Sequence, residues 1–456
     1  MKKIIALLLV VVLAASCLAG CAKTPAAPTD EPQKAETPAA AETKEDASSS
    51  EGKSEITGKL TYISWMTKGE DEAIINAFME EYPGVEVEIR TIDGTNYGAD
   101  ILTLCASGDV PDVLLTTPGY LADLVDQGYI APIDGFKGVE TQTSEAVNEV
   151  CSRNGSLYLY AINGGLGNFF IYYNKDIFEK YNLSVPTTPE ELDAICETLK
   201  NAGETPMIAA AGDTWNAAYF AYGAYFEALQ NLGGPVQAEI ALLEGSAKPS
   251  DIYGPVLQRL ADYKAKGYLS EGGLSMGWEA GAQYFCEGNG AMFATGNWFP
   301  GSGPVAENPD FKFGCFDTPQ TPLNGTHLDL LSIDRAIGIS AKTEYPEAAQ
   351  ALVEFFIRED NLSNYLTSQG LTGVNITVPT SPVFDDINTL LTGKGYTLSP
   401  KAMLDDMPTG WNSNNSQYFA DACAGSDPAE LAQKMDDEFA AFIAGIDVQP
   451  IIDALK

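Results

Sequence analysis

The chain has 456 residues, enough for two or three domains at about 150 residues each, with sizeable cores. Its 26 basic and 63 acidic residues give a formal charge of −37, which excludes a surface built to follow nucleic-acid phosphates. The single histidine, His327, excludes histidine-based catalytic triads and histidine-rich zinc sites. With 45% hydrophobic residues the composition is that of a soluble globular protein.

Residues 1–20 have the organisation of a signal peptide. Lys2 and Lys3 precede an apolar run over 4–15, which is too short to span a bilayer as a stable helix. The run ends in the letters LAGC, which resemble a lipobox, so we expect cleavage before Cys21 and a lipid anchor on it. The letters AASC make Cys17 a weaker candidate for the lipidated cysteine. The other alternative is a plain secretory signal whose cysteine carries no lipid.

Residues 21–57 are expected to form a disordered tether. From residue 22 this segment holds no aromatic residue and consists mostly of Ala, Pro, Thr, Ser, Glu and Lys. Such a composition cannot bury enough apolar surface to offset chain entropy. The tether would hold a folded module at the outer face of a cytoplasmic membrane.

Six further cysteines show no spacing typical of a metal site, so no metal is expected. Cys105 and Cys196 fall on apolar positions of helical patterns, which favours buried free thiols over disulfides. The six are Cys105, Cys151, Cys196, Cys286, Cys315 and Cys423.

The folded part begins near Lys59 with alternating strand and helix patterns. Strands are predicted over 60–65, 85–90 and 111–115. Helices are predicted over 70–82 and 120–127, and a further helix that carries Cys105 ends at Gly108. This alternation indicates a parallel α/β sheet.

A second series of the same kind begins near residue 168. Strands are predicted over 169–173, 207–211 and 291–294, and helices over 176–181, 189–200, 256–265 and 281–286, with an aromatic-rich helix ending at 229. Thr188 opens a capping box with proline at the first helical position. Helices over 346–357 and 428–443 follow, the second capped by Asp427. The sequence thus predicts two α/β lobes and a helical C-terminal region.

Candidate ligand-binding residues directly follow the predicted strands, because ligands of open α/β sheets bind outside the carboxyl ends of strands. They are Trp65, Thr67, Thr116, Thr117, Asp213, Trp215, Asn297 and Trp298. Trp411 and Asn412 join them from a polar stretch that lacks a core pattern. The alternative for each tryptophan is an ordinary buried anchor.

Aromatic faces beside amides, carboxylates and hydroxyls suit a neutral polyhydroxylated ligand. The same faces would hold a cation, which keeps a polyamine as an alternative. No glycine-rich nucleotide loop, Walker loop, GxSxG or EF-hand pattern occurs, and no cofactor or catalytic residue is expected. A surface-anchored carbohydrate enzyme remains an alternative, although nothing singles out a carboxylate pair.

Four motifs, in the right order, resemble the family 1 extracellular solute-binding proteins, which are sugar-binding lipoproteins of ABC importers. The motifs are ASGDVPDVLL at 106–115, IYYNKDIFEKYNLSVPTTPEELDAI at 171–195, FCEGNGAMFATGNW at 285–298 and ISAKTEYPEAAQALVEFF at 339–356. The resemblance implies a type II periplasmic-binding-protein-like clamshell with three crossovers between its lobes. The N-lobe would comprise 58–167 plus 320–375 and the C-lobe 168–319 plus 376–456, with the ligand cleft between them.

The resemblance also implies a function without catalysis. The chain would capture a carbohydrate, an oligosaccharide, and deliver it as a monomer to the transmembrane subunits of an ABC permease. Carried over motif by motif, the binding positions coincide with the strand-end residues and Trp411, and the glycine-rich segment 161–168 adds Asn163 and Asn168. Maltose-binding relatives place an aromatic residue and an acid where this chain has the letters TTPG at 116–119, which argues against maltose as the ligand.

Overall fold

A computed structural model of the chain describes residues 56–66, 68–92, 94, 97–166, 169–321, 327–379, 382–385, 396–399, 411 and 414–456. The expected signal peptide, the lipid site at Cys21 and nearly all of the tether lie outside these residues. Within the described ranges, no helix combines the length and apolar character needed to cross a membrane.

The larger sheet has seven strands in the order β13-β12-β3-β1-β2, with β4 and β7 also paired to β12. The strands are β1 (Gly58–Ser64), β2 (Val85–Thr91), β3 (Val113–Thr116), β4 (Ile130–Ala131), β7 (Tyr160–Leu166), β12 (His327–Ser340) and β13 (Tyr396–Ser399). As predicted, β1 is parallel to β2 and β3. The expectation of a wholly parallel sheet is wrong, because β12 runs antiparallel to β3, β4 and β7.

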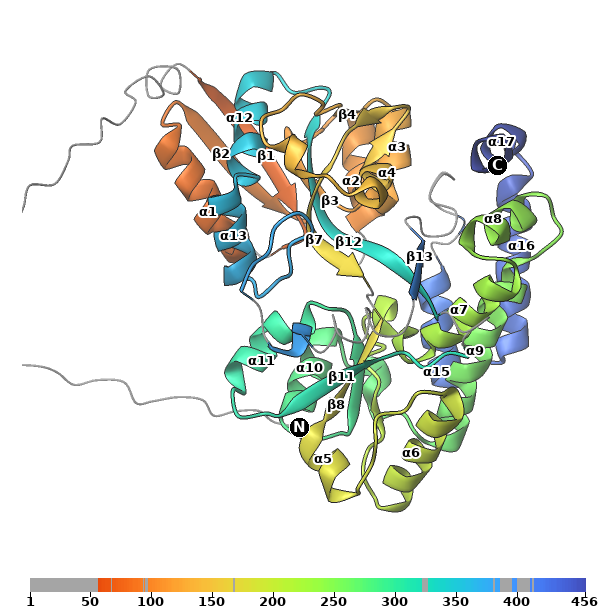
Figure 1. Ribbon diagram of the computed structural model, residues 1–456. Helices are drawn as coiled ribbons and strands as arrows, with labels where there is room; N and C mark the ends of the chain where they lie inside the picture. Colours follow the sequence, from red (N-terminus) through yellow and green to blue (C-terminus); the bar gives the residue numbers. More distant parts are fainter. Residues whose placement is uncertain are drawn as a thin grey trace, which may run out of the picture. The chain divides into compact units, whose positions relative to one another are not determined.

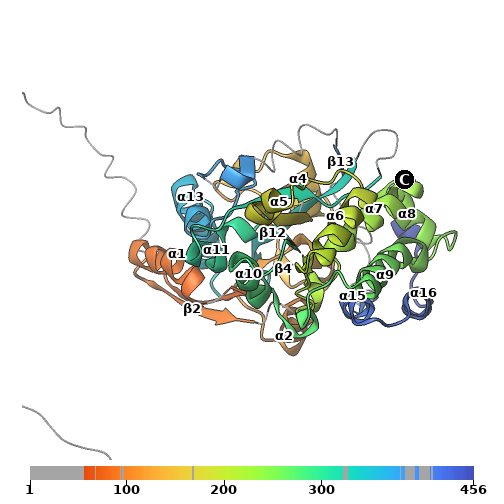
Figure 2. The same cartoon turned by 90° about the horizontal axis from the view of Figure 1, so that it is seen from below.

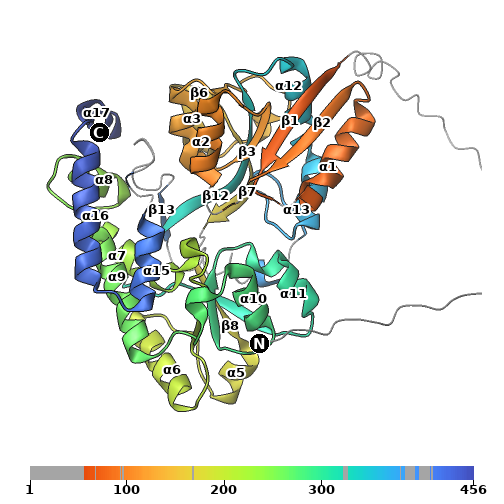
Figure 3. The same cartoon turned by 180° about the vertical axis from the view of Figure 1, so that it is seen from behind.

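Alternating side chains of the larger sheet build a core on each of its faces. Tyr62 packs into one cluster with Phe78 and Phe355, while the next residue, Ile63, packs into another with Leu114. The first face is covered by α1 and α12–α13, and the second by α2–α4 (Figures 1 and 3). The helices are α1 (Lys68–Glu81), α2 (Tyr97–Ser107), α3 (Leu121–Asp126), α4 (Glu145–Cys151), α12 (Pro346–Phe356) and α13 (Glu359–Ser368).

The smaller sheet has four strands in the order β11-β8-β10-β9. They are β8 (Phe170–Asn174), β9 (Met207–Ile208), β10 (Met292–Thr295) and β11 (Phe313–Asp317). The helices packed on this sheet are α5 (Lys175–Lys180), α6 (Pro189–Asn201), α10 (Trp278–Cys286) and α11 (Gly303–Glu307), whereas α7 (Tyr222–Asn231) and α8 (Pro235–Leu243) contribute to a separate helical core. The predicted cap of α6 is confirmed, since the Thr188 hydroxyl accepts a hydrogen bond of 3.2 Å from the Glu191 amide. The Glu191 carboxylate accepts instead from the Thr187 amide, at 2.7 Å.

Helices also form a separate layer at the C-terminal end, as predicted. Both α15 (Asn415–Ala424) and α16 (Pro428–Ile443) pack on α9 (Pro249–Lys266), and α17 (Gln449–Leu455) follows (Figure 2). The Asp427 carboxylate caps α16 by accepting a 2.9 Å hydrogen bond from the Ala429 amide. The predicted bounds of α16 are confirmed because its apolar positions recur with a clear helical period.

Strand β12 connects two hydrophobic cores. Its first four residues pair with β13, and Leu328 packs in the core formed by α7, α9, α15 and α16. Its last residues pair with β3, and Ile337 and Ile339 pack in the core of the larger sheet. Beside it runs β7 (Figure 1), so these two strands form a continuous link through the middle of the structure.

All six cysteines expected to be buried free thiols are confirmed as such. Burial raises the pKa of Cys151 to about 12 and that of Cys105 to about 11. We therefore expect Ellman's reagent at pH 8 to label these thiols slowly in the native protein and completely in guanidinium chloride, because thiolate is the reactive form. Peptide mapping by mass spectrometry would identify the labelled positions. A denatured count that rises after reduction would contradict free thiols.

Candidate ligand-binding site

Aromatic side chains gather where β9 and β10 end. These strands are parallel neighbours, so the loops at their carboxyl ends meet at one edge of the smaller sheet. Trp215, from the first loop, lies 5.8 Å from Trp298, from the second, measured between ring centroids. Tyr219 lies 6.0 Å from Trp215 and 6.3 Å from Trp298. We call Trp215, Tyr219 and Trp298 the aromatic group.

Trp298 is the member of this group that contacts both sheets' cores. Its half-buried ring packs against the core of the smaller sheet and also against that of the larger sheet. The ring covers Gly296, where a Cβ atom would come within 2.1 Å of the indole. At Gly301 a Cβ atom would lie 2.2 Å from the Gly370 carbonyl oxygen. The loop after β10 therefore approaches the segment after α13 too closely for a side chain at Gly301, and the indole of Trp298 leaves no room for one at Gly296.

The larger sheet contributes Trp65, which follows β1. Its ring meets that of Tyr97 edge to face at 4.9 Å. The Tyr97 hydroxyl donates to the Leu115 carbonyl of β3, which ties the start of α2 to the end of that strand. Thr116 is fully buried as the last residue of β3, whereas Thr117 behind it is half-buried. Trp65 and Trp298 share one cluster, since both pack against the core of the larger sheet.

A polar group lies on the two linking strands. The Asn163 side-chain amide on β7 donates to the Asp334 carboxylate on β12 at 3.4 Å. Arg335 pairs with the same carboxylate through its Nε, at 3.5 Å. Its Nη1 donates to the Tyr365 hydroxyl of α13 at 2.9 Å. Asn163 and Arg335 are buried, while the Asp334 side chain is 25% exposed.

The hydrogen bonds continue from Arg335 into the larger sheet. The Tyr365 hydroxyl donates to Asp71 at 3.1 Å, and the Ser64 hydroxyl donates to the same carboxylate at 2.6 Å. Burial raises the pKa of Asp71, and the Ser64 hydrogen bond and the Arg335 charge oppose this shift. The end of β1, α1, α13 and β12 are thus held together by one buried network.

Electrostatics connect the polar group to the aromatic group. Burial is the main reason that the pKa of Tyr219 is raised well above its usual value, and the neighbouring Tyr222 and the Asp334 charge raise it further. Asp334 thus lies close enough to Tyr219 for its charge to contribute to this shift. Sequence reasoning missed both Tyr219 and Asp334; the available signal was a charged pair inside an otherwise mostly apolar run, LLSIDRAIGIS at 330–340.

Two of the expected site residues have structural partners. The Asp213 carboxylate accepts a 2.6 Å hydrogen bond from the Trp278 amide and so caps the start of α10. Trp411 is only 4% exposed and packs in the helical core, with its ring 5.1 Å from that of Phe439. The expectation that Trp411 lies outside the core is wrong, because its partners come from elements far from it in sequence.

The remaining predicted positions differ in how far the structure describes them. Asn297 is buried beside Trp298 at the end of β10. Thr67, Asn168 and Asn412 lie outside the described residues. Within the described part of the chain, no group of three or more His, Cys, Asp or Glu side chains is arranged to hold a metal ion. The arrangement is one of aromatic faces and hydrogen-bonding groups, which suits binding.

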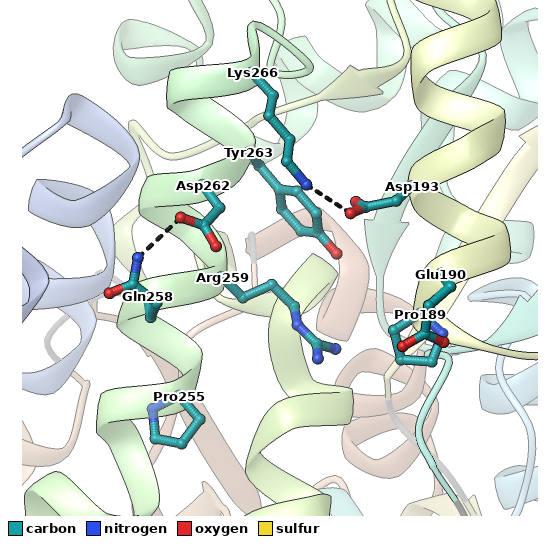
Figure 4. Close-up of a pocket in the computed structure, with 9 residues that line it drawn as sticks. All are labelled: Pro189, Glu190, Asp193, Pro255, Gln258, Arg259, Asp262, Tyr263 and Lys266. Atoms are coloured by element: carbon teal, nitrogen blue, oxygen red, sulfur yellow. Dashed lines mark hydrogen bonds and ion pairs between the residues drawn. The ribbon is translucent and has the colours of Figure 1, made fainter.

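A charged hollow of about 350 Å³ lies elsewhere, between α6 and α9 (Figure 4). The Lys266 ammonium and the Asp193 carboxylate form an ion pair of 2.6 Å across it. On the α9 side, Gln258 donates to Asp262 at 2.9 Å. None of the predicted site residues lines this hollow.

Comparisons with known proteins agree with this architecture. The family model described as bacterial extracellular solute-binding protein matches residues 64–362. An ABC transporter extracellular-binding protein of Pyrococcus horikoshii, itself uncharacterized, is 23% identical over 65% of this chain and 67% of its own length. A maltooligosaccharide ABC transporter solute-binding lipoprotein of Streptococcus pneumoniae is 28% identical, over 38% of this chain and only 39% of its own length.

Among solved structures, the solute-binding protein RafE in complex with raffinose is similar in fold. It superposes with a TM-score of 0.72 at 22% identity, over 85% of this chain and 100% of that one. This likeness confirms the expected two-lobed α/β fold.

Proposed function

The chain belongs to the bacterial extracellular solute-binding proteins, and on this premise we propose that it captures an oligosaccharide for an ABC importer. The observation that carries the proposal is the aromatic group, with Trp215 and Trp298 5.8 Å apart at the ends of neighbouring strands. Aromatic rings cover the C–H faces of sugars, while adjacent carboxylates accept hydrogen bonds from the sugar hydroxyls and adjacent amides both donate and accept. The printed names of a relative and a neighbour, which cite maltooligosaccharide and raffinose, support a sugar ligand.

In this proposal the ligand binds between two lobes that close on it. The N-lobe comprises 58–167 plus 320–375, and the C-lobe 168–319 plus 376–456. Support comes from the separate cores of the two sheets and from β12, which runs from the helical core to the core of the larger sheet. Residues at strand ends can absorb the backbone rotation of such a closure, which would present both lobes to the permease subunits.

Members of this family bind solutes outside the cell, and we propose that this chain does so from a lipid anchor on Cys21 as a monomer without enzymatic activity. The lipobox-like letters and the tether composition support the anchor. Delivery to a separate permease would also explain why the sequence lacks a phosphate-binding loop, since ATP hydrolysis would occur on another subunit.

A sugar panel tests the proposal. We expect at least one of raffinose, stachyose, maltotriose and chitotriose to raise the thermal midpoint and change the tryptophan emission of the purified protein. A ligand present at 100 times its Kd adds about 2.7 kcal/mol of stability by mass action. Monosaccharides and a salt-matched buffer serve as controls. The absence of a shift with every sugar would refute the carbohydrate assignment.

A polyamine is the second candidate, because aromatic faces bind cations and the partly exposed Asp334 carboxylate would attract one. A midpoint shift with spermidine that weakens steeply with salt would favour it. Loss of an added glycan during incubation would instead indicate an enzyme.

A further inference from the structure

Asp334 occupies a β-bulge on the strand that links the cores. In the pairing of β12 with β7, Ile333 lies opposite Gly164 and Arg335 opposite Asn163, so Asp334 is an extra residue on its strand. A bulge turns a side chain away from the regular alternation and is common beside binding sites. Here it places an acid within a strand whose neighbouring residues Ile333 and Arg335 are buried.

Two buried side chains hold the Asp334 carboxylate in place. Asn163, 1% exposed, donates to it, and Arg335, 6% exposed, pairs with it at 3.5 Å. Arg335 is anchored in turn by its hydrogen bond to Tyr365. These contacts restrict the orientation of the Asp334 side chain, which is 25% exposed, and selective recognition requires such positioning.

Carboxyl groups outnumber cations in the network of Asp334, Arg335 and Asp71. Arg335 is the one cation in the network and interacts with two carboxyl groups, Asp334 and Asp71. The sum is −1 when both carboxyls are ionised and 0 when Asp71 holds a proton. A ligand carboxylate placed beside Asp334 would therefore meet no excess positive charge, while a hydroxyl group would find an ionised acceptor.

We propose that Asp334 is a specificity-determining residue, whose carboxylate accepts hydrogen bonds from hydroxyl groups of the bound oligosaccharide and excludes sugars that carry a carboxylate. This inference rests on the proposed function and extends it to neutral over uronic-acid sugars. Asn163 and Arg335 act as positioning residues for it. Repulsion between like charges at a partly buried site is an effective way to reject the wrong ligand.

The test compares matched sugars on the full chain by calorimetry. Raffinose, maltotriose and chitotriose are each paired with a derivative in which one primary hydroxyl is oxidised to a carboxylate. The unmodified protein should bind the neutral member of a pair and reject the oxidised one. In Asp334→Asn, loss of the charged acceptor should weaken neutral binding about tenfold while binding of the oxidised sugar improves, so that the affinity ratio falls about a hundredfold.

A matched control is Asp193→Asn, which also removes an acid paired to a basic side chain but at the hollow between α6 and α9. It should leave both affinities unchanged. A purely structural role for Asp334 would lower both affinities together, and an unchanged ratio in Asp334→Asn would overturn the inference. If no neutral sugar binds the unmodified protein, the proposed function fails instead.

A second variant covers the case in which Asp334→Asn does not fold. Asp334→Glu keeps the charge but moves the carboxylate outward by one methylene. It should still reject the oxidised sugars while binding the neutral ones more weakly. Acceptance of an oxidised sugar by this variant, or neutral binding at full strength, would count against Asp334.

Discussion

The Trp411→Ala protein should unfold with a free energy about 3–5 kcal/mol lower than that of the unmodified protein, as is typical when a buried tryptophan is truncated. Trp411 is 4% exposed, and its ring lies 5.1 Å from Phe439 and 6.2 Å from Tyr253. Truncation removes contacts to α9 and α16 together and leaves a cavity between them. Urea denaturation followed by circular dichroism would measure the loss.

The matched control is Trp411→Phe, which keeps an aromatic ring in the same core. It should lose much less stability and bind sugar with unchanged affinity, because the indole packs among apolar residues of the helical core. A fall in affinity for the folded Trp411→Phe protein would restore the ligand-binding role that the sequence predicted. A stability loss in Trp411→Ala below about 1 kcal/mol would contradict its place in the core.

Truncation of Trp298 should have its largest effect on binding. Trp298→Ala removes the ring that lies beside Trp215 and packs against both cores. Covering a sugar face with an aromatic ring contributes about 2–3 kcal/mol, so the Kd should rise about a hundredfold. Calorimetry with the tightest sugar of the panel, performed well below the thermal midpoint, would measure this change.

Trp278→Phe is the control for this measurement. Trp278 begins α10, which packs on β10, and its indole donates to the Thr295 hydroxyl at 2.7 Å, outside the aromatic group. Its replacement should lower stability slightly and leave affinity unchanged. Because Trp298 is half-buried, Trp298→Ala should also melt at a lower temperature; a lower midpoint with unchanged affinity would show that its role is structural alone.

The ends of strands were the most informative positions in the sequence. Trp215 and Trp298 could be predicted as neighbours because both follow strands of one sheet, and parallel strands bring their carboxyl ends to one edge. Asp213 was predicted by the same rule, yet its carboxylate caps α10. The rule locates a region, and the hydrogen bond that a side chain makes there depends on which other backbone groups arrive beside it.

Long-range pairing explains what sequence reasoning missed. Asn163 and Asp334 are 171 positions apart, and only the register of β7 with β12 brings them into hydrogen-bonding distance. A bulge has no periodic signature, so the sequence does not mark Asp334 as the residue displaced from the strand's alternation. The antiparallel direction of β12 likewise depends on the path by which the chain returns to the sheet, which no local sequence pattern encodes.

The sequence by itself determined the local features of this protein: the alternation of strands and helices, the caps at Thr188 and Asp427, the buried thiols and the tryptophans at strand ends. These depend on periodicity and on residues a few positions apart, so the chain encodes them locally. Only the tertiary structure decided that Trp411 packs in a core and that Asp334 meets the side chain of Asn163. Both outcomes depend on partners from distant segments, whose meeting is set by the packing of whole elements and not by any local pattern.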